Sequence, residues 1–215
     1  FRENKRVGED YLAETFELEY NRDEYVFEFT DEEKQHIENY KKEIGLKPDD
    51  KIIGFNTGCS ELFPNKKMTL EQHEVLIERF LSYGDYKVML LGGPEDTERN
   101  NLLAAHFGDK IINTPTTEGV RRGACYESLP HVVITGDTFG MHLAIALKKY
   151  VIAWFGLSCW TEIDLFDRGV ILAPEGLDCA PCWNKKCPKD LECIQMIDLE
   201  RIEKETVKYF EEKDI

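Results

Sequence analysis

Residues 132–156, VVITGDTFGMHLAIALKKYVIAWFG, restrict the possible fold more than any other stretch of the chain. An apolar run at 132–134 leads into a short polar turn, and apolar residues then recur at helical spacing as far as Lys148. A second apolar run follows at 151–155. This order predicts a strand, a tight turn, a helix and another strand, with the turn facing the crevice where open α/β sheets bind ligands.

The rest of the chain repeats this alternation. Apolar runs begin near residues 51, 87, 111 and 170, and segments of helical composition lie between them. The segments Thr-Asp-Glu-Glu at Thr30 and Thr-Leu-Glu-Gln at Thr69 have the form of capping boxes, which predict helix starts. Strands that alternate with helices predict an α/β fold, with a mostly parallel sheet covered on both faces.

We expect one domain with a short lead-in. Residues 1–49 are interpreted as a connector that ends in a helix, and residues 50–215 as the domain itself. Within the connector, the alternating residues 25–29 predict either an edge strand or more connector. The chain starts without methionine, in sequence that is typical of the middle of a protein, so we expect a fragment.

Polar residues follow three of the predicted strands. Because parallel strands end at one edge of a sheet, we expect these residues to lie close together there. Backbone donors, hydroxyl groups and a mobile cation suit a diphosphate, an acidic residue after a strand suits ribose hydroxyls, and a helix start suits an anion. The candidate ligand-binding residues are Thr57, Ser60, Lys66, Glu95, Asp137, Thr138, Gly140 and His142.

Each candidate also has a structural interpretation. Asp137 or Thr138 alone is sufficient to cap the following helix, and His142 then only packs. A lysine pair such as Lys66-Lys67 is more often solvated surface, and Glu95 favours the helix dipole from a first turn. The individual signals are therefore weak, and their convergence at one edge is the reason to treat them as one site.

Charge and hydropathy exclude other roles. The formal net charge is −15, from 42 acidic and 27 basic residues, which disfavours nucleic acid or an anionic membrane as a partner of the whole chain. No apolar run approaches the roughly 20 residues that cross a bilayer, and the first residues do not resemble a secretion signal. We expect a cytoplasmic protein.

Four of the seven cysteines lie within fifteen residues, at Cys179, Cys182, Cys187 and Cys193. Four thiolates at this spacing suit a structural Zn²⁺, and paired or free thiols are the alternative. We do not assign a metal site to them, and any zinc there would brace a long loop. The other three cysteines are interpreted as small buried hydrophobes.

The segment GDTFGMHLAIALKKYVIAWFG resembles the signature of glycosyltransferase family 9, the ADP-heptose:lipopolysaccharide heptosyltransferases. The family pattern is Asp-Thr-Gly, two residues and His before an Ala-rich helix, and Phe139 stands here where the family has glycine. Lys66 matches a family lysine that contacts donor phosphate, although Met68-Thr69 replace the family's Trp-Pro. Gly93-Pro94-Glu95 matches a family Gly-x-Glu whose carboxylate binds the nucleoside.

The resemblance implies the carboxyl-terminal, Rossmann-like donor domain, which is one half of a GT-B glycosyltransferase. It implies transfer of heptose or a related sugar from an ADP-sugar to the lipopolysaccharide core with inversion, with no required cofactor. The lipid-linked acceptor and the general base belong, by resemblance, to an amino-terminal domain, so we expect residues 1–215 to bind donor but transfer no sugar. A full-length enzyme would act in the cytoplasm or at the inner face of the membrane.

Two other functions agree with the same sequence. One is a nucleotide-sugar binding or epimerase-like protein on the same scaffold, because a shared fold does not establish chemistry. The other is a non-catalytic interaction module that is stapled by metal through its cysteines. Nucleotide-sugar interconversion without an acceptor would favour the first, and bound zinc without nucleotide binding would favour the second.

Overall fold

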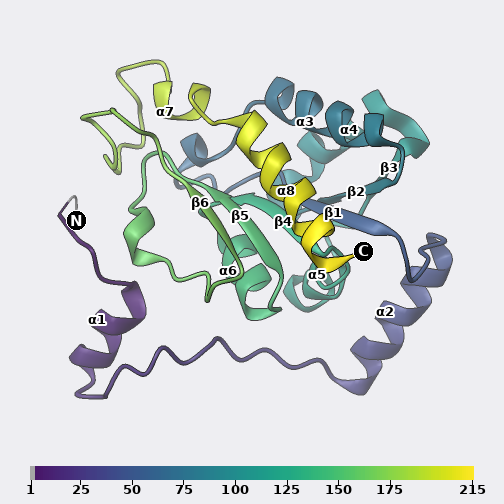
Figure 1. Cartoon of the computed structure of the whole chain (residues 1–215), viewed down its shortest axis with the longest axis horizontal. Coiled ribbons are helices and arrows are strands. Elements are labelled where there is room, and N and C mark those ends of the chain that lie inside the picture. The colour runs from purple at the N-terminus through teal and green to yellow at the C-terminus, as the bar shows by residue number, and fades with distance from the viewer. Residues whose placement is uncertain (1–2) are drawn as a thin grey trace.

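A computed structural model describes residues 3–215 of the chain. Six parallel strands form one sheet in the order β3-β2-β1-β4-β5-β6 (Figure 1). The strands are β1 (Lys51–Asn56), β2 (Tyr86–Leu91), β3 (Ile111–Asn113), β4 (Val132–Gly136), β5 (Tyr150–Trp154) and β6 (Gly169–Leu172). The predicted parallel α/β sheet is therefore confirmed, and all six expected strands are present.

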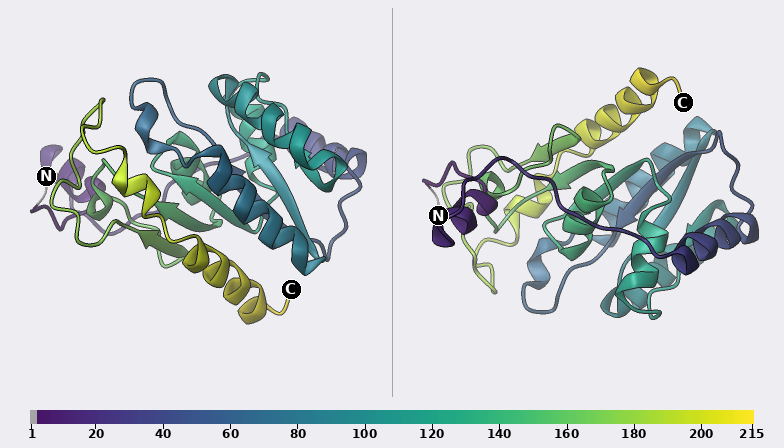
Figure 2. Two further views of the ribbon diagram at one scale, coloured as in Figure 1. Left: turned by 90° about the horizontal axis from the view of Figure 1, so that it is seen from above. Right: turned by 90° about the horizontal axis from the view of Figure 1, so that it is seen from below.

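Helices cover both faces of the sheet (Figures 1 and 2). The α-helices are α1 (Gly8–Thr15), α2 (Asp31–Glu43), α3 (Leu70–Tyr83), α4 (Thr97–Phe107), α5 (Val120–Glu127), α6 (Phe139–Ala146), α7 (Glu192–Gln195) and α8 (Leu199–Lys213). The single-turn 3-10 helices are η1 (Pro64–Lys66), η2 (Pro94–Asp96), η3 (Gly108–Lys110) and η4 (Trp160–Glu162). Both predicted capping boxes are present, at Thr30 with Glu33 and at Thr69 with Gln72.

Two apolar layers result, because most residues of the four central strands are buried and side chains alternate between the faces. On one face α3, α4 and α8 pack on the sheet through residues such as Leu76, Leu103 and Phe210. On the other face α2, α5 and α6 pack through Tyr40, Tyr126 and Met141 among others. The sheet is thus buried on both sides, as a parallel sheet requires.

Residues 3–30 contribute no strand to the sheet. Residues 25–29 pair with no strand of the described chain, and α1, which the sequence did not predict, buries none of its residues. Figure 1 shows the segment between α1 and α2 running along the outside of the domain. Ion pairs attach it there: Arg22 to Asp164 at 2.6 Å and Glu24 to Arg168 at 2.7 Å.

The chain order places a crevice at the centre of the sheet. The chain passes from β1 outward to β2 and β3, and then returns to the other side of β1 with β4. Connections therefore leave the neighbouring strands β1 and β4 in opposite directions, and ligands bind in open α/β sheets outside the carboxyl ends of strands at such a switch point. No helix within residues 3–215 is both long enough and apolar enough to span a membrane.

Candidate nucleotide-binding site

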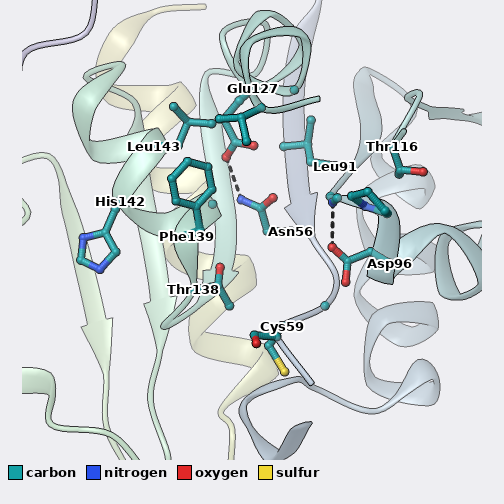
Figure 3. Close-up of a pocket in the computed structure, with 18 of the residues that line it drawn as sticks. Asn56, Cys59, Leu91, Asp96, Thr116, Glu127, Thr138, Phe139, His142 and Leu143 are labelled. Atoms are coloured by element: carbon teal, nitrogen blue, oxygen red, sulfur yellow. Dashed lines mark hydrogen bonds between the residues drawn. The ribbon is translucent and has the colours of Figure 1, made fainter. Parts of the chain in front are cut away.

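A cavity of about 590 Å³ opens at the carboxyl edge of the sheet, beside this switch point (Figure 3). Its walls come from the segments that follow β1, β2, β3 and β4 and from one face of α5. The volume lies within the range of small-molecule and cofactor sites. Of the eight candidate residues, six line this cavity: Ser60, Lys66, Asp137, Thr138, Gly140 and His142.

Lys66 and Asp137 form an ion pair at one part of the cavity, which we call the lysine region. The Lys66 Nζ and Asp137 Oδ2 atoms are 2.6 Å apart, and each side chain is 15% exposed. The ammonium group also lies over the ring of Trp183, 5.0 Å from its centroid, and 5.6 Å from that of Phe63. Asp137 is thus a partner of Lys66 and not a helix cap, and it orients the cation at the cavity.

The amino end of α6 lies beside this pair. Thr138 occupies the N-cap position but makes no side-chain capping bond, so neither Thr138 nor Asp137 acts as the cap that the structural interpretation supposed. A Cβ atom on Gly140 would lie 2.6 Å from the Asn56 amide, so glycine is required here for close packing of α6 against β1. Uncapped N–H groups at a helix start favour anions.

His142 is oriented differently from the expectation. Although it borders the cavity, Figure 3 shows its imidazole directed away from the labelled pocket residues. Its Nδ1 atom lies 3.4 Å from the Tyr25 hydroxyl, and the two rings are 6.1 Å apart. The side chain therefore contacts the segment before α2. Ser60 lines the cavity and is exposed.

Two candidates lie outside the cavity. Thr57 is fully buried and its hydroxyl contacts Asn100, because successive side chains at the end of β1 point to opposite faces and Asn56 takes the cavity side. Glu95 is exposed on the outer side of η2, where it accepts a hydrogen bond from the Glu61 N–H at 3.3 Å. Contact of Thr57 with a diphosphate, or of Glu95 with a ribose, would require the side chain to turn toward the cavity.

Asp96, the neighbour of Glu95, lines the cavity instead. Its carboxylate accepts a hydrogen bond from the Gly93 N–H at 2.9 Å, and burial raises its pKa. Gly58 and Gly92 leave room for it, since a Cβ atom on either would lie within 3 Å of the Asp96 side chain. The sequence pointed to Glu95, whereas the adjacent carboxylate of Asp96 is the one that faces the cavity.

Asn56 and Glu127 form a second polar region that sequence reasoning missed, which we call the carboxyl region. Asn56 Nδ2 donates a hydrogen bond to Glu127 Oε1 at 2.7 Å (Figure 3). Burial raises the pKa of Glu127 to about 8, although the Asn56 hydrogen bond and the charge of Lys149 both act to lower it. The one available signal was a glutamate on the otherwise apolar side of the predicted helix.

The cysteine-rich segment lies near the lysine region. Asn65 donates a hydrogen bond to the Lys185 carbonyl at 2.9 Å, and Trp183 lies over Lys66. Burial raises the pKa of Cys193, and the thiols of Cys179, Cys182 and Cys187 are close enough to raise it further. Within residues 3–215, however, no three His, Cys, Asp or Glu side chains have an arrangement that could hold a metal ion. The possible structural zinc has no support from this geometry.

Fold and cavity together define an α/β ligand-binding domain of the doubly wound class. A family model identifies the protein further: the model of glycosyltransferase family 9 (heptosyltransferase) matches residues 9–192, so the chain belongs to this family. Comparison with curated protein sequences gave no significant match.

Three solved structures are similar in fold. A glycosyl transferase family 9 protein from Veillonella parvula superposes with a TM-score of 0.77 at 22% identity, over 97% of this chain and 61% of that one. ADP-heptose lps heptosyltransferase II from E. coli has a TM-score of 0.67 at 19% identity, over 88% and 54%. E. coli heptosyltransferase WaaC with ADP has a TM-score of 0.57 at 18% identity, over 79% and 46%. This chain therefore spans roughly half the length of these proteins.

Proposed function

We propose that this chain is the donor-binding part of an inverting glycosyltransferase, and that its cavity takes an ADP-sugar carrying heptose or a related sugar. Family membership supports a glycosyltransferase. The observation that carries the donor assignment is the meeting of Lys66 with the uncapped start of α6 at the switch-point cavity. A mobile cation and helix N–H groups together are suited to a diphosphate.

The chemistry follows from the charge that develops in the reaction. When the bond between the anomeric carbon and the diphosphate breaks, the diphosphate leaves with the bonding electrons and negative charge grows on its oxygen. Preorganised donors stabilise that charge. Lys66 would supply the cation, with the Thr138 hydroxyl and the α6 N–H groups as further donors. Asp137 would hold the Lys66 ammonium in place before the donor arrives.

The acceptor half of the reaction requires a general base within hydrogen-bond reach of the attacking hydroxyl. We propose that this base, and the site for a lipid-linked saccharide of the lipopolysaccharide core, belong to a part of the full-length enzyme outside residues 1–215. Residues 1–215 alone would then bind donor and transfer no sugar. Sugar transfer by this chain alone, measured with an ADP-heptose donor and a core acceptor, would contradict that division.

Calorimetric titration with a series of nucleotides tests the proposal. We expect ADP to bind more tightly than AMP and adenosine, because the lysine region contacts the diphosphate, and more tightly than UDP or GDP. Thermal shift should give the same order, since a ligand that binds only the folded state stabilises it. If ADP, UDP and GDP all fail to bind, the proposal of a nucleotide site is contradicted. If UDP or GDP binds more tightly than ADP, the nucleotide site stands and the proposed donor is a UDP-sugar or a GDP-sugar instead.

A further inference from the structure

We infer that Glu127 is a specificity-determining residue, which donates a hydrogen bond from its neutral carboxyl group to the heteroaromatic base of the donor nucleotide. The inference rests on the proposed function and extends it to the end of the ligand remote from the phosphates. Glu127 is only 3% exposed, and yet it lines the cavity. A buried carboxyl group in a binding cavity is costly to keep, which makes it a candidate functional group.

The hydrogen bonds of Glu127 leave one oxygen available. Asn56 Nδ2 donates to Oε1 and fixes the carboxyl group, whereas Oε2 accepts no hydrogen bond from any residue between 3 and 215. A protonated carboxyl group has one O–H donor and keeps acceptor capacity on the other oxygen. The Oε2–H group is therefore the free donor of the carboxyl region.

Burial keeps Glu127 neutral at pH 7, against the opposing effect of the neighbouring cation. Lys149, before β5, is the cation that faces it, and the Lys149 ammonium donates to the Ser128 carbonyl at 2.5 Å. Burial lowers the pKa of Lys149 to about 8, which limits the help that this cation gives to a carboxylate. The other charged side chains of α5 face α2, where Arg121 pairs with Glu33 and Arg122 with Glu32.

Charged groups on the other walls are already paired or held elsewhere. In the lysine region Asp137 neutralises Lys66, and after β2 the Asp96 carboxylate accepts from Gly93. From α6, His142 contacts Tyr25. A diphosphate is attracted by the cation of the lysine region, so Glu127 at the other part of the cavity would meet an uncharged part of the donor.

The shape of α5 suits a flat group. Val120, Gly123 and Glu127 all line the cavity and are spaced by three and four residues, so they share one helix face. A Cβ atom on Gly123 would meet no atom within 4 Å, which means that the helix surface is open there. A planar ring can lie against the glycine with a ring nitrogen or carbonyl oxygen at Oε2–H. A nucleobase has this shape and these acceptors.

Titration of the chain with ADP at pH 7 and pH 9 tests the role of Glu127. If only the protonated form binds well, the apparent ADP dissociation constant should rise about tenfold between these pH values, following the fraction of the neutral acid. Glu127→Gln retains a donor and cannot ionise, so its affinity at pH 7 should persist and the pH dependence should disappear. Glu127→Leu should weaken ADP at least tenfold at pH 7. Inorganic pyrophosphate should bind all three proteins alike.

A variant at a second position tests the same inference even if the Glu127 variants do not fold. Gly123→Leu adds a side chain where the fold leaves open space, so it should fold, retain pyrophosphate and lose ADP. Gly123→Ala should lose little of the ADP affinity, because a methyl group is much smaller than the leucine side chain. An ADP affinity that is flat with pH in the natural chain, or unchanged in Glu127→Leu, would overturn the inference while nucleotide binding stands. No ADP binding by the natural chain at either pH would overturn both proposals.

Discussion

The two polar regions of the cavity differ in how they carry charge. In the lysine region Lys66 and Asp137 are both partly open to solvent, and each has the other as an oppositely charged partner at 2.6 Å. In the carboxyl region Glu127 is almost completely buried, and its hydrogen-bond partner is the neutral amide of Asn56. Access to water and the charge of the nearest partner thus decide whether an acidic side chain is a carboxylate or a neutral acid.

This difference gives the cavity a direction. A ligand with an anionic end and an uncharged end has one favourable orientation, with the anion at Lys66 and the neutral part at Glu127. A nucleoside diphosphate has such ends. The comparison teaches that selectivity in this site arises as much from a buried acid as from the partly buried lysine that a sequence motif indicates.

The largest effect expected is on the free energy of unfolding. Burial disfavours the carboxylate form of Glu127, so ionisation of this side chain destabilises the folded state. Its pKa is raised from 4.5 to about 8, so between these values the folded state holds a proton that the unfolded state has released. The contribution of Glu127 to the free energy of unfolding should therefore fall as pH rises from about 4.5 to 8 and then level off. At about 1.4 kcal/mol per pKa unit, Glu127→Gln should be the more stable protein at pH 9 by on the order of 5 kcal/mol.

Urea denaturation of both proteins at pH 5, 7 and 9 measures this difference. Glu98, which is exposed on α4, offers a matched control, and Glu98→Gln should follow the pH profile of the natural chain. If the free energies of unfolding of the natural chain and of Glu127→Gln differ by the same amount at all three pH values, Glu127 is not a neutral acid in the folded state, and the contrast between the two regions fails.

The next effect concerns the lysine region. Lys66→Ala should weaken ADP binding by about 1–3 kcal/mol, because a charge-assisted hydrogen bond to phosphate is lost and Asp137 is left without its cation. Lys67→Ala is the control, since Lys67 is adjacent but does not line the cavity. Isothermal titration at low and at moderate salt measures both variants. Equal losses in the two would mean that only general electrostatic attraction is at work.

The sheet and the lysine region could be predicted from sequence because both depend on local patterns. Apolar runs marked all six strands, and the turns after β1 and β4 contain Lys66 and Asp137. The ion pair between these two side chains could not be predicted, since it joins positions 71 residues apart and depends on the strand order. The same strand order made the cavity possible.

The carboxyl region could not be predicted for a different reason. Asn56 resembles any last residue of a strand, and Glu127 resembles any helix glutamate, so neither belongs to a recognisable motif. Burial of Glu127 follows only from the way that α5 packs beside β1 and α6. Likewise, the choice between Glu95 and Asp96 depended on the direction of one 3-10 turn, η2. Side-chain direction in short turns is set by tertiary contacts and not by propensity.

The smallest effect expected comes from the aromatic side chain above Lys66. Trp183 lies 5.0 Å from the Lys66 ammonium, a geometry that stabilises the cation by about 0.5–1 kcal/mol at a partly exposed site. Trp183→Ala should therefore weaken ADP binding two- to fivefold, by leaving Lys66 less well oriented, whereas Trp183→Phe should retain most of the affinity. Because the ring lies over Lys66 and against Phe63, the pH dependence that Glu127 confers should be the same in both variants. A change in that pH dependence would show that the two regions are coupled and are not independent ends of one cavity.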